Sequence, residues 1–184
     1  MVRPVADAQR SADQAPPPNF SDWGACPFEC CTYRQWTVDK PTAIYRDRST
    51  TSAVVFRVRK GDRVTGMTGV VITIKPGKAA IRKDTTLGEG TRKIHVKAGD
   101  TLYLLHYEGE GFFKFWFRGK TYDREMLFPP DNPVGKSILT DGTASDIETI
   151  SDPETVWWVK VKNRAGQVGW TRQAEHFGNM DSCG

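Results

Sequence analysis

The chain has 184 residues, of which 38% are hydrophobic, 11% aromatic and 26% charged. This composition excludes collagen-like fibres and intrinsically disordered chains, and no apolar run approaches the roughly 18 residues of a membrane span. With 26 Lys and Arg residues against 22 Asp and Glu, the net charge of +4 indicates a slightly basic globular protein of one domain or two small ones.

The first 35 residues are predicted to form a disordered arm that bears prolines and cysteines. Pro16, Pro17 and Pro18 stiffen it into an extended spacer, and the Ala, Asp, Gln and Ser residues before them offer little to bury. This stretch also lacks the continuous apolar run of a signal peptide. We therefore expect either a cytoplasmic protein or an exported one whose signal lies outside this sequence.

The four cysteines are unevenly placed. Cys26, Cys30 and Cys31 form a cluster, and Cys183 is the penultimate residue. In an exported protein they favour one or two disulfides, which could tie the C-terminal tail to the N-terminal cluster; buried free thiols fit equally well. A metal site has weaker support, because C-x3-C-C differs from the C-x2-C spacing of zinc ribbons. No cofactor is expected.

From residue 37 onward the chain has the pattern of a mainly β protein. Within residues 51–77, Val-rich and Ile-rich runs are interrupted by glycine and proline, which is typical of short strands joined by tight turns. The interrupting residues are Gly61, Gly66, Gly69, Pro76 and Gly77. In the later run FFKFWF, alternation places Phe113, Phe115 and Phe117 on the core face of a strand.

Charge is segregated along the chain. Residues 37–93 contain 13 basic and 5 acidic residues, whereas residues 129–155 contain 1 basic and 6 acidic ones. The acidic segment also has four prolines and few apolar residues, so it is predicted to be a long loop. Either segment can attract a partner of opposite charge, or the two can face each other.

The segment VWWVKVKNRAGQVGWTRQAEHF is predicted to form a hairpin of strands over 156–162 and 167–171, followed by a 3₁₀-like turn. The two faces of its first strand are Trp157, Val159 and Val161 on one side and Trp158, Lys160 and Lys162 on the other. Paired tryptophans before a basic turn and a Gly-Trp pair resemble the distal hairpin of SH3-like barrels.

The segment TAIYRDRSTTSAVVFRVRKGDRVTGMTG is similar to the opening of a bacterial SH3 domain. It has a first strand with Tyr45 and Arg46, a Ser-rich and Thr-rich loop, an apolar strand over 54–58 and a Lys-Gly-Asp turn at 60–62. A second Gly-Asp turn, within residues 97–100, again precedes an apolar strand. These features imply the fold of a small β-barrel.

The resemblance to bacterial SH3 domains covers residues 37–70 and 94–177. Two features depart from the family pattern. The first copy lacks its own tryptophan hairpin, and Arg172 and Gln173 replace the proline that usually follows the Gly-Trp pair. The layout as a whole also resembles a group of uncharacterised bacterial proteins, which implies a fold and no reaction.

Two architectures fit these motifs. In the tandem one, which the second Gly-Asp turn favours, SH3-like β units occupy residues 36–93 and 94–184, and the acidic loop 129–155 belongs to the second. In the nested one, a single barrel takes its first strands from 37–75 and its last from 156–177, with the residues between them inserted. Barrels of this size are marginally stable alone, so the tandem units would share an interface.

SH3-like barrels hold extended peptides or glycan-linked peptides against exposed aromatic rings, because flat rings bury much area at low entropic cost. The candidate ligand-binding residues here are Tyr45, Trp116, Trp158 and Trp170; half-buried core positions are their alternative role. The resemblance implies a non-catalytic module that binds a peptide, peptidoglycan or protein ligand at the bacterial cell envelope, in the periplasm or outside the cell.

Nucleic-acid binding is the alternative function, with phosphates contacted by Arg57, Arg59, Lys60 and Arg63. It has weaker support, because the basic segment offers few aromatic residues for base stacking. Catalysis is not expected, since the chain has no G-x-S-x-G, H-E-x-x-H, P-loop or dinucleotide motif. A catalytic pairing of Cys31 with His176 has no local support.

Overall fold

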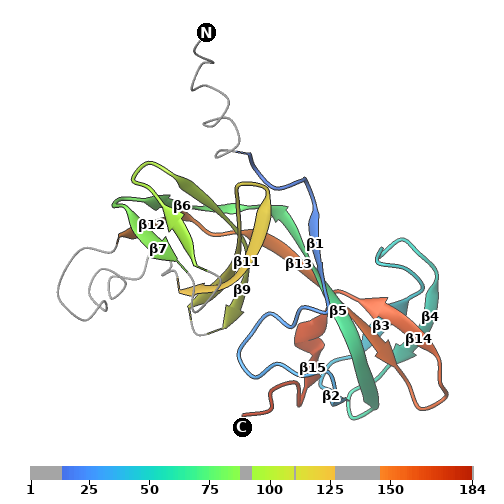
Figure 1. The fold of residues 1–184 in the computed structure, drawn as a ribbon. Coiled ribbons are helices and arrows are strands. Elements are labelled where there is room, and N and C mark those ends of the chain that lie inside the picture. The colour runs from blue at the N-terminus through green and yellow to red at the C-terminus, as the bar shows by residue number, and fades with distance from the viewer. Residues whose placement is uncertain (1–13, 88–92, 110, 127–145, 184) are drawn as a thin grey trace. The chain divides into compact units, whose positions relative to one another are not determined.

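The computed structural model describes residues 14–87, 93–109, 111–126 and 146–183 (Figure 1). These residues form strands joined by turns, with no α-helix and a 3₁₀ turn, η2 (Ala174–His176). The mainly β prediction is therefore confirmed, as is the helical turn after the tryptophan hairpin. None of the described residues belongs to a helix long and apolar enough to cross a membrane.

The chain divides into two compact units, each assembled from two separate stretches of sequence. One, which we call the terminal unit, comprises Ser21–Ile72 and Val156–Gly184. The other, the inserted unit, comprises Met1–Phe20 and Thr73–Thr155. As in the nested architecture, the tryptophan hairpin shares a unit with strands from the beginning of the chain, but Met1–Phe20 groups with the other unit, which neither architecture includes.

Eight strands form the sheet of the terminal unit. They are β1 (Phe20–Trp23), β2 (Gln35–Val38), β3 (Thr42–Tyr45), β4 (Val54–Val58), β5 (Arg63–Lys75), β13 (Glu154–Lys162), β14 (Val168–Thr171) and β15 (Phe177–Gly178). Their order is β15-β2-β5-β13-β14-β3-β4, with β1 paired to β5. Figure 1 shows the late hairpin β13–β14 lying between the early strands β5 and β3. The predicted tryptophan hairpin is confirmed.

The core of the terminal unit is centred on Trp36, which is fully buried. Its ring centroid lies 5.8 Å from that of Phe177, and its indole N–H donates to the Thr32 carbonyl at 3.0 Å. Val159 and Val161 belong to the same cluster, so the face of β13 that they share is the inward one. Strand pairing in this sheet thus brings residues from both ends of the sequence into one core.

The glycines at positions 66 and 69 are not turn residues, so the prediction of short strands there is wrong. Both lie inside β5, a single strand of 13 residues. A Cβ atom at Gly66 would meet the Trp36 ring at 2.5 Å, and one at Gly69 would overlap the Tyr33 hydroxyl and the Trp157 indole nitrogen. These glycines are needed because large rings pack directly on the strand backbone.

Tyr33 lies against this glycine-lined part of β5. Its hydroxyl donates to the Ala25 carbonyl. Burial raises the pKa of Tyr33 from 10.0 to about 12, because the phenolate would lose its hydration. The nearby Trp157 indole N–H, which has no hydrogen-bond partner of normal geometry among the described residues, offsets this effect only in part.

In an ultraviolet absorbance titration, one of the five tyrosines is expected to ionise near pH 12, and Tyr33→Phe should remove that step. Because the folded pKa is the higher one, this group's contribution to stability is complete below pH 10 and is lost as the pH rises through about 12. A late step that persists in the Tyr33→Phe protein would contradict the assignment.

The N-terminal segment from residue 14 to residue 35 is ordered, which corrects the prediction of a disordered arm of 35 residues. Pro16 is buried, and residues 20–23 form β1. The part of that prediction concerning residues 1–13 lies outside the described residues. Pairing of β1 with β5, which is distant in sequence, orders a segment that has few apolar residues of its own.

The cysteines form two disulfides, both in the terminal unit. Cys26 pairs with Cys31 at a Cα–Cα distance of 5.5 Å, and Cys30 pairs with Cys183 at 5.6 Å. Beside them, the Thr32 N–H donates to the Met180 carbonyl at 2.8 Å. The predicted link between the C-terminal tail and the N-terminal cluster is confirmed, and no thiol remains free for a metal or for catalysis.

The inserted unit contains a five-stranded sheet in the order β11-β10-β9-β6-β12 and a hairpin of β7 and β8. Its strands are β6 (Gly77–Ile81), β7 (Thr85–Leu87), β8 (Ile94–Val96), β9 (Thr101–Gly109), β10 (Phe112–Phe117), β11 (Lys120–Met126) and β12 (Ile147–Ser151). Phe113, Phe115 and Phe117 lie in its core, which confirms the predicted face of β10.

The predicted acidic loop is shorter than its proposed bounds of 129–155. Its last part forms β12 and the start of β13, with Ile147 opposite Ile81 of β6. Gly77 makes this pairing possible, since a Cβ there would lie 2.5 Å from the Ser151 carbonyl oxygen. The part of the prediction that covers residues 129–145 lies outside the described residues.

Candidate functional site

The four aromatic residues predicted to line a groove do not all lie together. Tyr45 and Trp170 pair across β3 and β14. Trp158, on β13, is only 6% exposed, so its ring is not available to a ligand. Trp116 belongs to the inserted unit, where its indole N–H donates to the Gln14 carbonyl at 2.8 Å and its ring meets the edge of Phe20.

Tyr45 and Trp170 lie on the outer face of the terminal sheet. Both neighbours of Trp170 on β14 are buried, so its ring faces outward, and Tyr45 lies directly opposite it on the same face. On β13 the buried residues Val159 and Val161 flank Lys160, which faces outward and pairs with Trp170. Lys160, Trp170 and Tyr45 consequently form a row across three adjacent strands.

Trp23 extends this row, although the sequence did not single it out. It is 59% exposed, and its ring centroid lies 6.1 Å from that of Trp170 in an edge-to-face arrangement. The four residues of β1 are too few for a recognisable alternation. Only the pairing of β1 with β5 brings Trp23 to this face. We call Trp23, Tyr45 and Trp170 the aromatic platform.

Two cations lie on the platform. The Arg48 guanidinium is 4.5 Å from the Trp23 ring centroid and 5.9 Å from that of Trp170, and the Lys160 ammonium is 5.6 Å from Trp170. Each such contact is worth about 0.5–1 kcal/mol at an exposed site. No ion pair among the described residues neutralises either cation, so the platform combines flat apolar rings with positive charge.

The loop that carries Arg48 is ordered by its own hydrogen bonds. At its base the Arg46 N–H donates to the Ala53 carbonyl at 2.8 Å. Within it, the Asp47 N–H donates to the Ser52 hydroxyl at 3.2 Å. The Ser-rich and Thr-rich sequence therefore forms a compact connection between β3 and β4, which holds Arg48 over the rings.

The basic residues proposed for nucleic-acid binding lie around one turn of the terminal unit and are all exposed. Arg57 is on β4, Arg59 and Lys60 are in the turn that follows, and Arg63 begins β5. Arg57 and Arg63 also line a pocket. Aromatic rings are not among the residues that line this pocket, so the pocket itself provides no surface for base stacking.

Comparison of the chain with protein-family models, with curated proteins and with solved structures finds no match. The resemblance to bacterial SH3 domains consequently rests on the motifs of this sequence, and functional inference rests on the surfaces described above.

Proposed function

We propose that the terminal unit is an SH3-like, non-catalytic binding module that holds an extended peptide segment against the aromatic platform. The observation that carries this proposal is the edge-to-face pair of Trp23 and Trp170 on an outward face, with Tyr45 opposite Trp170 and the Arg48 guanidinium over both tryptophan rings. Such rings bury a large area at low entropic cost, and they suit ligands whose side chains alternate.

The charge of the platform indicates the kind of peptide. Arg48 and Lys160 favour a ligand that carries carboxylates, because a cation already positioned over a ring loses little further freedom on pairing. Peptidoglycan stem peptides are extended and anionic, so they satisfy both requirements. We favour them over neutral peptides and over a protein partner without an acidic segment.

The disulfides bear on the cellular compartment in which this binding would occur. Two disulfides within one unit are compatible with an oxidising compartment, where such bonds form and persist. The proposal therefore sets the protein at the bacterial cell envelope, in the periplasm or outside the cell.

Binding of a synthetic stem peptide, measured by titration calorimetry, tests the proposal. Trp23→Ala is expected to weaken binding at least tenfold, about 1.4 kcal/mol, since a central aromatic anchor contributes this much or more. Arg48→Gln should weaken it less and should reduce its salt dependence. Co-sedimentation with purified sacculi should show the same ranking.

Met67→Ala is the matched control, because Met67 is also an exposed apolar residue of the terminal unit, at 43%, but lies outside the platform. It should bind like the wild type. If the Trp23→Ala protein bound the peptide with wild-type affinity, or if Met67→Ala weakened binding as much as Trp23→Ala, the platform would not be the binding site.

A further inference from the structure

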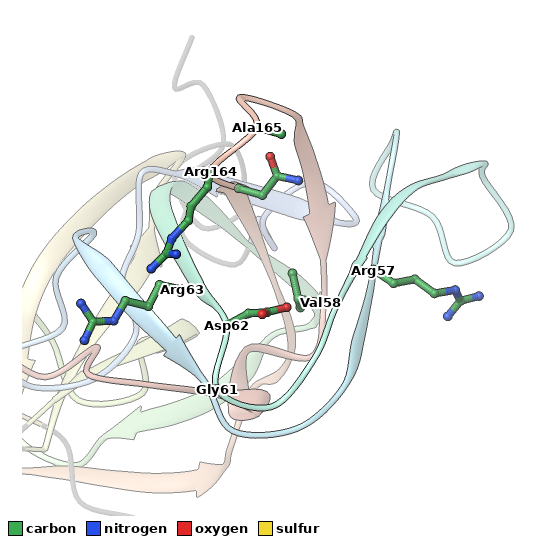
Figure 2. Close-up of a pocket in the computed structure, with 8 residues that line it drawn as sticks. Arg57, Val58, Gly61, Asp62, Arg63, Arg164 and Ala165 are labelled. Atoms are coloured by element: carbon green, nitrogen blue, oxygen red, sulfur yellow. The ribbon is translucent and has the colours of Figure 1, made fainter.

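A pocket of about 310 Å³ lies at one end of the terminal sheet, apart from the platform residues. One wall is the turn between β4 and β5, with Gly61, Asp62 and Arg63. The other is the turn between β13 and β14, with Asn163 and Arg164. The two walls are about 100 residues apart in sequence, so only the folded sheet creates the pocket (Figure 2).

Backbone hydrogen bonds fix the first wall. The Asp62 carboxylate accepts from the Arg59 N–H at 2.7 Å, and the Asp62 N–H donates to the Arg59 carbonyl at 3.0 Å. The Gly61 N–H donates to the Val38 carbonyl at 2.8 Å, which anchors the turn to β2. Arg63 therefore leaves this wall from a rigid position.

The second wall is fixed in a similar way. The Asn163 side-chain oxygen accepts from the Gln167 N–H at 2.9 Å, and the Asn163 N–H donates to the Gln167 carbonyl at 3.0 Å. Gly166, with φ of 81°, supplies the left-handed conformation that closes the turn. Arg164 thus projects from a second ordered turn.

The pocket carries an excess of positive charge. Three arginines line it, Arg57, Arg63 and Arg164, and the single carboxylate, that of Asp62, is engaged by its own turn. None of the ion pairs among the described residues involves these arginines. Figure 2 shows the side chains of Arg63 and Arg164 extending to the same side of the pocket, whereas Arg57 extends away from it.

We propose that this pocket is a phosphate-binding site in which Arg63 from one wall and Arg164 from the other bind the same phosphate group. Planar guanidinium groups donate paired hydrogen bonds to phosphate oxygens, and two of them match the charge of a phosphate dianion. A volume of about 310 Å³ is at the small end of ligand pockets, which suits a phosphate monoester of a small molecule. The site is independent of the platform and of its function.

The test is a titration of the isotope-labelled protein with glycerol 3-phosphate, followed by NMR at constant ionic strength, with glycerol as the uncharged control. Saturable shifts are expected at the amides of residues 61–63 and 163–165. The paired variant Arg63→Gln with Arg164→Gln should weaken binding at least tenfold. Trp23→Ala should leave it unchanged, so this result and that of the peptide experiment can be told apart.

Arg59→Gln with Lys60→Gln is the matched control. It also removes two positive charges, from residues of the β4–β5 turn that do not line the pocket, and should change the affinity less than threefold. Equal weakening by the two pairs, or shifts that do not saturate, would overturn the proposal. So would binding of single-stranded oligonucleotides that depends more on Arg59 and Lys60, since that result would indicate an extended nucleic-acid surface.

Discussion

Replacing both Cys30 and Cys183 with serine is expected to lower the free energy of unfolding by about 5 kcal/mol. The disulfide joins residues 153 positions apart, and the loss of denatured-state entropy on closing a loop grows with the logarithm of its length. Replacing Cys26 and Cys31, which are 5 positions apart, should lower it by only about 2 kcal/mol.

The two double variants control for each other, because each removes one disulfide from the same cluster and leaves no unpaired thiol. Denaturant unfolding followed by tryptophan fluorescence and by near-ultraviolet circular dichroism gives both values. The tail beside Met180 and Asp181 should also lose its contacts with Thr32 and Cys31 in the first variant. An equal loss of stability in the two variants would show that loop length does not determine the effect.

Trp36→Ala is expected to destabilise the protein by about 3–5 kcal/mol, the usual range for removing a large buried aromatic ring. The ring is fully buried between Tyr33 and Phe177, and it covers Gly66 of β5, so its removal leaves a cavity that the rigid strand cannot fill. The indole hydrogen bond to Thr32 is lost as well.

Trp23→Ala removes the same side chain from an exposed position and is the control. Because Trp23 is 59% exposed, the change should destabilise the protein by less than about 1 kcal/mol. Denaturant titrations of both variants give the two free energies of unfolding that test this prediction. Similar losses in the two would mean that Trp36 is not at the centre of the core.

Some features of the fold could be predicted from the sequence because they depend on neighbouring residues. Alternation alone identified the core face of β10 with Phe113 and Phe115. It also put Val159 and Val161 on one face of β13, and the structure shows that this face is the inward one. The uneven placement of the cysteines suggested a disulfide between the C-terminal tail and the N-terminal cluster, although buried free thiols fitted the same pattern. The structure contains two disulfides, one of which makes this link.

The sequence-based predictions were wrong where the role of a residue depends on a neighbour that is distant in the sequence. Gly66 and Gly69 have the same local appearance as turn glycines, yet they make room for Trp36, Tyr33 and Trp157 inside a long strand. Tertiary packing decides between these roles, since both are compatible with the local sequence.

The candidate site was predicted in part. Tyr45 and Trp170 lie together on the outer face, as the hypothesis of a groove requires, whereas Trp158 is buried and Trp116 belongs to the other unit. Trp23 and Arg48 could not be found from the sequence, because their contacts with Trp170 span more than 100 residues.

The β class, the alternating faces of the strands and the segregation of charge can all be derived from the spacing of residue types along the chain. The fold was needed to show that the sequence of one unit interrupts that of the other, and that rings and arginines distant in sequence share a surface. Strand pairing and burial depend on residues far apart in the sequence, and no local pattern indicates which of them come into contact.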